Sequence, residues 1–181
     1  DYYEYDVASQ SDIKAILKSP ASYHSLKTIG IEGEALVFGK MFHMYILEPK
    51  SFNDNYIIGP QCRRNTKEWK AFVSENPGKE IVKPDEMYML KAMHESILSH
   101  PTGSKVLKSG LSGKVENAFF TRLESEKDVK VLVKGKFDMF TNDGWVVDLK
   151  TMSDSSPKNF VRQVTNYNMD VQASMYVDGL E

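Results

Sequence analysis

Two aspartates and a lysine in the C-terminal half of the chain have side chains suited to binding a divalent metal and acting on a phosphate. Asp148 lies ten residues after Asp138, and Lys150 follows two residues later. Residues two apart project from the same side of a β-strand, so the ammonium would join the carboxylates. Paired carboxylates can share a hard cation such as Mg²⁺, which keeps several waters that a phosphate can displace. The candidate chemistry is therefore metal-assisted hydrolysis of a phosphate ester.

A predicted β-hairpin brings the two carboxylates together. The pattern predicts strands from Val131 to Phe140 and from Trp145 to Lys150, joined by a turn at Asn142–Gly144 whose glycine takes the left-handed position. This turn sets Asp138 directly opposite Asp148. Directly opposed like charges destabilise a hairpin, so folding alone gives little reason for the pair. A bound cation gives one.

Glu116 is a further acidic candidate, in a strand predicted from Lys114 to Leu123. It shares a face of that strand with apolar neighbours. Beside Asp138 it would be a third acidic group near the metal. An ion pair with Lys136 across the sheet explains the same position equally well.

His43 lies in a helix predicted from Glu32 to Glu48. Four-residue steps place Gly39, His43 and Leu47 on one face, where the small residue allows close packing and the histidine would be buried. A hydrogen-bonded core histidine and a metal ligand both fit this pattern.

Three cations without an acid, Arg63, Arg64 and Lys67, form a basic loop. A solvated loop is the ordinary explanation for such a run. Phosphate binding is the alternative, because arginine forks onto phosphate oxygens and local charge can override the overall balance.

Other helices are predicted around these residues. Ser9 or Ser11 can cap a first helix, and Ser19-Pro20 stops it before a second. Further helices are predicted from Asp85 to Ser99, after Ser155-Ser156-Pro157, and from about Asn168.

Length and composition limit the class of protein. The 181 residues can bury a substantial core and predict one domain. The net charge is −2 and the isoelectric point is near 6.1, so any DNA contact must come from a local basic patch. The single cysteine, Cys62, excludes an internal disulfide and a four-cysteine metal site, which fits a reducing cytoplasm. No apolar run approaches the length of a membrane span, so we expect no membrane partner.

The C-terminal motif has a family likeness. Gly135-x-x-Asp138, nine intervening residues and Asp148-x-Lys150-Thr151 resemble the core signature of PD-(D/E)XK nucleases. The other motifs occur in an order similar to that of RecE-type (exonuclease VIII-like) members of the RecB-like branch of this superfamily. They are Ser11-Asp12-Ile13-Lys14 with Ser19-Pro20-Ala21-x-Tyr23, Gly39-x-x-x-His43-x-x-Ile46-Leu47-Glu48-Pro49, the basic loop, Glu116, and Gln172-x-x-x-Tyr176.

The resemblance implies an α/β (α+β) fold in which helices flank a central mixed β-sheet and an antiparallel hairpin carries the active site. We expect a single nuclease domain over residues 1–181, with a mainly helical part at 1–110 and the catalytic sheet with its following helices at 111–181. The chain opens at Asp1 rather than at Met, and in the family a strand and helix normally follow the last motif. We therefore expect it to be a fragment whose fold continues beyond residue 181.

The resemblance also implies an activity and a set of site residues. It implies 5′→3′ degradation of linear double-stranded DNA from its ends, with Mg²⁺ as cofactor and Mn²⁺ as a substitute. The expected setting is phage or prophage recombination in the cytoplasm, in a ring-shaped homo-oligomer beside a single-strand annealing recombinase. The expected catalytic residues are Asp138, Asp148 and Lys150, the metal ligands are His43, Asp138, Asp148, the backbone carbonyl of Leu149 and Glu116, and the DNA contacts are Arg63, Arg64, Lys67, Gln172 and Tyr176.

Two alternatives fit the same residues. An endonuclease of the same superfamily would cut a covalently closed circle, which an exonuclease leaves intact. A DNA-binding module that kept the fold and lost catalysis would bind DNA without cutting it.

Overall fold

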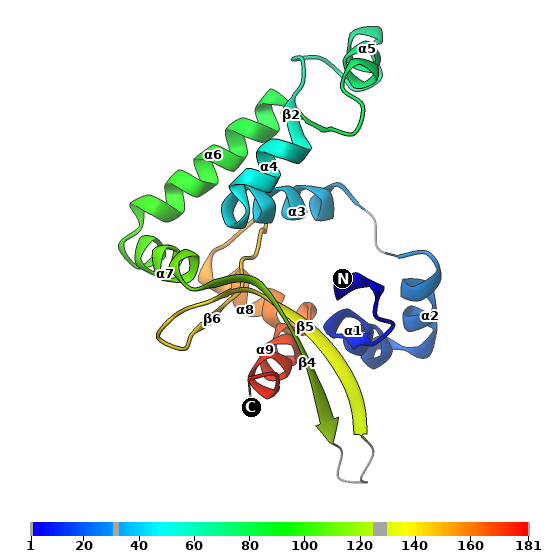
Figure 1. Ribbon diagram of the computed structural model, residues 1–181, viewed down its shortest axis with the longest axis vertical. Helices are drawn as coiled ribbons and strands as arrows, with labels where there is room; N and C mark the ends of the chain where they lie inside the picture. The colour runs from blue at the N-terminus through cyan, green and yellow to red at the C-terminus, as the bar shows by residue number, and fades with distance from the viewer. Residues whose placement is uncertain (1, 31–32, 125–129, 181) are drawn as a thin grey trace. The chain divides into compact units, whose positions relative to one another are not determined.

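The computed structural model describes residues 2–30, 33–124 and 130–180, and the chain divides into two compact units (Figure 1). The first unit combines Asp1–Glu32 with Lys114–Glu181, and the second is Gly33–Gly113. Helices are combined with a mixed sheet, which confirms the predicted α/β class. A single nuclease domain over the whole chain stays a prediction.

The first unit is built around a mixed sheet and contains the helices predicted near the N-terminus and the C-terminus of the chain. Its elements are η1 (Tyr2–Glu4), β1 (Ala8–Ser9), α1 (Gln10–Lys18), α2 (Pro20–Thr28), β4 (Lys114–Glu124), β5 (Lys130–Phe140), β6 (Val146–Val147), α8 (Pro157–Asn166) and α9 (Met169–Asp178). Strand β5 pairs antiparallel with β4 along its whole length. Its other edge pairs with β1 in parallel and with β6 antiparallel. Figure 1 shows β4 and β5 as two long adjacent arrows.

The hairpin has the predicted register, but its second strand is shorter than predicted. Gly144 has a φ of 87°, and the Thr141 amide donates to the Trp145 carbonyl at 2.9 Å, as the turn requires. Strand β6 covers only Val146–Val147, so the prediction of a strand from Trp145 to Lys150 is wrong in its extent. The reason is local, because the amide of Leu149 donates to a side chain of β5 instead of to its backbone.

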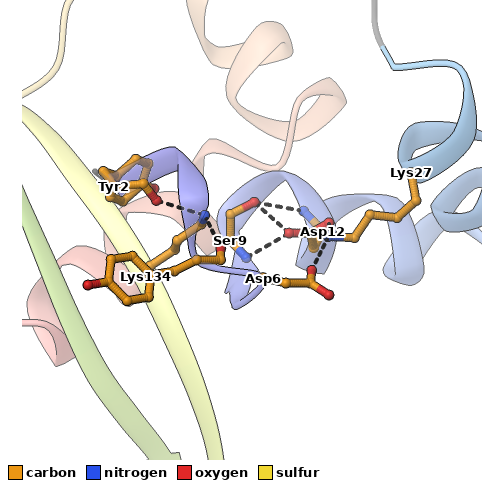
Figure 2. Close-up of polar contacts among 7 residues, drawn as sticks. Tyr2, Asp6, Ser9, Asp12, Lys27 and Lys134 are labelled. Atoms are coloured by element: carbon orange, nitrogen blue, oxygen red, sulfur yellow. Dashed lines mark hydrogen bonds and ion pairs between the residues drawn. The ribbon is translucent and has the colours of Figure 1, made fainter.

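The N-terminal segment is fastened to the sheet by a buried lysine (Figure 2). The ammonium of Lys134 is on β5 and donates to the carbonyl oxygens of Tyr2 at 3.0 Å and Tyr5 at 2.6 Å. Lys134 is buried, so these hydrogen bonds offset the cost of removing its charge from water. Strand β1 pairs with β5 directly before α1 begins, so the start of α1 also lies beside β5.

Ser9 and Asp12 start α1 with a capping box, which Figure 2 draws together with Lys27. The Ser9 amide donates to Asp12 Oδ2 at 2.8 Å, and Lys27 of α2 pairs with Asp12 Oδ1 at 3.2 Å. Burial opposes ionisation of the Asp12 carboxyl, but the Ser9 hydrogen bonds and Lys27 outweigh it and lower its pKa below 3.8. Ser19 caps α2 through the Ser22 amide at 3.0 Å, so the predicted helix pair is confirmed.

A close approach in the aromatic core of the first unit requires glycine at position 135. Gly135 lies opposite Phe119, and a Cβ atom added to it would overlap the Phe119 ring. That ring also stacks on Phe137, with centroids 4.8 Å apart, and meets Tyr176 edge-on at 6.1 Å. The ring therefore has little room to move away from a new methyl group.

Replacing Gly135 with alanine is expected to lower the free energy of unfolding by about 1–3 kcal/mol, the usual cost of overpacking a core. Urea denaturation measures the loss. The matched control repeats the substitution in a Phe119→Leu background, where the smaller side chain should reduce the loss. Equal losses in both backgrounds would contradict this explanation of the glycine.

The second unit consists mainly of helices. Its elements are α3 (Glu34–Leu47), α4 (Pro49–Asn55), β2 (Tyr56–Ile58), α5 (Lys67–Glu75), β3 (Glu80–Val82), α6 (Pro84–Ser99) and α7 (Pro101–Ser112), and β2 pairs with β3 in parallel. Phe42 of α3 and Leu90 of α6 belong to its buried core. Helix α3 falls within the predicted range, although Glu32 lies outside the described residues. Within the described parts of both units, no helix has the length and apolar character needed to cross a membrane.

Candidate active site

Three carboxylates form a row across neighbouring strands of the first unit. In the β4–β5 ladder, Val115 pairs with Met139 and Asn117 with Phe137, which leaves Glu116 opposite Asp138. In the β5–β6 ladder, Met139 pairs with Val147, and one further step places Asp148 opposite Asp138 on its other side.

This row concentrates negative charge, because a carboxylate oxygen of Glu116 lies within 4.8 Å of one of Asp138. Opposed like charges oppose strand pairing. Each of the three acids therefore needs a partner that favours its charged form.

Glu116 reaches its place through a strained backbone. Its φ is 52°, in the left-handed region that glycine normally occupies, although it lies within the long strand β4. Its carboxylate pairs with Lys136, which is the alternative that the sequence left open. The ion pair and the approach to Asp138 occur together, so the two explanations do not exclude each other. Backbone strain of this kind clusters at functional sites.

Asp138 is buried and is held by the segment that follows β6. It is 9% exposed, and its Oδ2 accepts a hydrogen bond from the Leu149 amide at 2.6 Å. A hydrogen bond from a backbone amide stabilises a carboxylate in its ionised form. The Leu149 carbonyl, predicted as a metal ligand, stays a prediction.

Asp148 is held from two sides. Lys150 forms an ion pair with its Oδ2, and Gln172 of α9 donates from Nε2 to its Oδ1 at 2.7 Å. The same Gln172 nitrogen lies 2.7 Å from the Tyr176 hydroxyl, which donates to the Lys136 carbonyl at 2.9 Å. Burial, followed by the nearby Asp148 charge, raises the pKa of Tyr176 and keeps it a neutral phenol.

Gln172 and Tyr176 are therefore buried parts of the site, at 5% and 4% exposure. Their polar atoms are used within the protein, which supports a role in holding Asp148. Their predicted contact with DNA stays a prediction. A cavity of about 730 Å³ adjoins this group and is lined by Asp148, Lys150 and apolar side chains of α8 and α9.

The donor atoms of this group suit a hard divalent cation. Oxygens of Glu116 and Asp138 lie close together, with Asp148 next in the row. Mg²⁺ and Mn²⁺ prefer such carboxylate oxygens. A cation between them would also offset the repulsion within the row, so the residues present fit the predicted metal.

The chain was also compared with known proteins. A family model described as a PDDEXK-like domain of unknown function (DUF3799) matches residues 9–181. The chain belongs to this family. Neither the curated proteins nor the solved structures gave a significant match. Membership in the PDDEXK-like family confirms the predicted superfamily and indicates a nuclease-type function.

Other predicted residues of this PDDEXK-like chain lie in the second unit. His43 is half-buried on α3, and its role as a ligand stays a prediction. In the basic loop, Arg64 pairs with Glu86 at 2.8 Å and lies over the Trp69 ring at 5.8 Å. Arg63 and Lys67 are exposed. DNA contact by this loop is likewise untested.

Lys14 of α1 contacts the group that holds Asp148, although its residue pattern did not predict such a contact. Its ammonium donates to Gln172 Oε1 at 3.2 Å, which links the first helix to the Asp148 group. Burial, followed by the charge of Lys150, lowers the pKa of Lys14. The motif Ser11-Asp12-Ile13-Lys14 indicates this segment, but helix periodicity does not show which distant group the Lys14 side chain contacts.

Proposed function

We propose that this protein is a metal-dependent deoxyribonuclease that hydrolyses phosphodiester bonds of linear double-stranded DNA from its ends. The observation that carries the proposal is the row of Glu116 on β4, Asp138 on β5 and Asp148 directly after β6, with Lys150 paired to the last of them. Opposed acids can bind a cation that promotes phosphate hydrolysis, whereas without a cation they destabilise strand pairing.

Each residue has a defined part in this proposal. Asp138 and Asp148 hold a divalent cation, Mg²⁺ or Mn²⁺, with Glu116 beside them and His43 and the Leu149 carbonyl completing the ligands. A bound cation of this kind acidifies water and neutralises charge on phosphate. Lys150 leaves its ion pair with Asp148 to position the attacking water or to stabilise the charge that develops on the phosphate.

The finer proposal is a RecE-type exonuclease that works 5′→3′ in phage or prophage recombination. Its support is the order of motifs along the chain, from the capped helix pair to Gln172 and Tyr176. A ring-shaped homo-oligomer and a single-strand annealing recombinase as partner belong to the same proposal, as does DNA contact by Arg63, Arg64 and Lys67.

Incubation with Mg²⁺ and three DNA substrates tests the activity. The substrates are a linear duplex labelled at its 5′ ends, the same duplex labelled at its 3′ ends, and a covalently closed circle. Early release of the 5′ label as mononucleotide or short oligonucleotide, with the circle intact, is the expected result. An excess of EDTA should abolish it.

The alternatives give different results in the same assay. Cutting of the closed circle would favour an endonuclease of the superfamily. Early release of the 3′ label alone would reverse the polarity. Binding of all DNA without cutting, measured by gel shift, would favour a binding module that lost catalysis.

A further inference from the structure

A chain of hydrogen bonds connects Lys14 on α1 to the carboxylate of Asp148. The Lys14 ammonium donates to Gln172 Oε1 at 3.2 Å, and Gln172 Nε2 lies 2.7 Å from Asp148 Oδ1. Lys14 and Asp148 are 134 positions apart in sequence, and a single buried amide joins them.

The chemistry of its partners fixes the orientation of the Gln172 amide. An ammonium can only donate, so the atom that faces Lys14 must be the amide oxygen. An ionised carboxylate can only accept, so the atom that faces Asp148 must be the amide nitrogen. Both ends require the same orientation.

The remaining hydrogen of the Gln172 amide is also used. It can point to the Tyr176 hydroxyl at 2.7 Å, and that hydroxyl donates to the Lys136 carbonyl. A flipped amide would bring two oxygens together at Asp148 and two donors together at Lys14. The Gln172 amide thus uses its oxygen and both of its hydrogens, and a fully hydrogen-bonded buried amide is held rigidly.

The network acts on one particular oxygen of Asp148. Gln172 takes Oδ1, whereas Lys150 pairs with Oδ2. When Lys150 turns to the substrate, Oδ2 becomes available while Oδ1 is still held. The carboxylate then keeps its direction at the moment when it must hold a cation.

Lys14 itself is placed for this task. It is half-buried, and among the described residues it makes one hydrogen bond, to Gln172, and no ion pair. An ammonium that is partly removed from water normally pairs with an acid. Here it supports an amide instead, and the Asp148 charge lies just beyond that amide.

We propose that Lys14 is a positioning residue of the active site, which orients the Asp148 carboxylate for metal binding by fixing the Gln172 amide. This inference rests on the proposed function, because it assigns the carboxylate to a divalent cation. It adds a residue of α1 to the group that holds Asp148, which otherwise consists of Lys150 and Gln172.

Metal affinity without DNA gives the test, with Mn²⁺ as the probe and electron paramagnetic resonance or calorimetry as the measurement. Lys14→Met keeps most of the aliphatic stem and removes the donor. We expect it to weaken Mn²⁺ binding by about 10-fold, the lower end of the usual effect of removing a group that orients a metal ligand, because Lys14 acts through Gln172. Lys14→Arg should restore most of the affinity, because the guanidinium can donate to the same oxygen.

Two further variants separate positioning from general stability. Lys18→Met removes an exposed lysine from the last turn of the same helix and should leave Mn²⁺ affinity unchanged. In a Gln172→Leu background, Lys14→Met should weaken binding no further, because its effect passes through the amide. Urea denaturation of every variant checks that the fold is intact.

The outcomes identify which proposal fails. If the unaltered protein binds Mn²⁺ and Asp138→Asn abolishes binding, but Lys14→Met has no effect, the role of Lys14 is overturned and the metal site stands. If the double variant loses Mn²⁺ affinity by the product of the two separate losses, Lys14 does not act through the Gln172 amide. Absence of Mn²⁺ binding by the unaltered protein would overturn the metal site and this inference together.

Discussion

Replacing Lys150 with alanine is expected to lower kcat for DNA cleavage by about 10²–10³-fold, the usual cost of losing one group that stabilises transition-state charge. Lys150 pairs with Asp148 in the structure, and in the proposed function it is the cation that acts on the phosphate. Mn²⁺ affinity should stay within about threefold or improve, because Gln172 still holds Asp148 and the competing ammonium is gone.

Single-turnover cleavage of linear duplex and Mn²⁺ binding without DNA measure the two effects separately. Lys158→Ala is the matched control, since it removes an exposed lysine at the start of α8 in the same unit. Retained cleavage by the Lys150→Ala variant would remove this residue from the proposed mechanism. Loss of metal binding in parallel with cleavage would instead make it part of the metal site.

Replacing Asp138 with asparagine is expected to abolish both cleavage and metal binding, because it removes the central charge of the row. The fold should tolerate the change. The asparagine oxygen can still accept the Leu149 amide, and its nitrogen can donate to the opposed Glu116. Without metal, the variant should be at least as stable as the unaltered protein, since the repulsion within the row is relieved.

Thermal melting without and with Mn²⁺ measures the stability of the variant and its loss of metal binding. At a Mn²⁺ concentration 100 times the Kd, binding stabilises the unaltered protein by about 2.7 kcal/mol. For a chain of this length, that corresponds to a rise in melting temperature of roughly 5–10 °C. The Asp138→Asn variant should show little or no rise.

Asp178→Asn, at the end of α9, removes an exposed aspartate of the same unit and should keep the full effect of Mn²⁺ on melting. An equal rise in the Asp138→Asn variant would place the metal elsewhere. A large loss of stability without metal would mean that the Asp138 charge supports the fold.

The turn at Gly144 shows which parts of the site could be predicted from local sequence. Its residues define a tight loop, and the loop sets the register that places Asp138 against Asp148. The capping residues Ser9 and Ser19 likewise define the start of α1 and α2. These features depend on neighbours within a few positions, so the sequence contains the necessary information.

The length of the second hairpin strand could not be predicted in the same way. The residue pattern predicts a strand as far as Lys150, but β6 ends at Val147. Beyond that point the Leu149 amide donates to the Asp138 side chain. Glu116 is similar, because its left-handed backbone within a strand departs from its local preference. Both exceptions occur at or beside the three acids, and departures from local rules are expected at functional sites.

The partners of Asp148 were decided by tertiary structure. Spacing alone predicts that Gln172 and Tyr176 share a helix face, but it does not say whether that face meets DNA or a carboxylate. Lys14 is even less predictable, since it comes from the other end of the chain and touches the site through Gln172. By itself the sequence determined the superfamily and the α/β class through the motifs that resemble those of PD-(D/E)XK nucleases. It also determined the opposition of two aspartates, because turns and strand register are short-range effects. Only the folded chain decided which groups hold those aspartates, because contacts between distant segments depend on how whole elements pack.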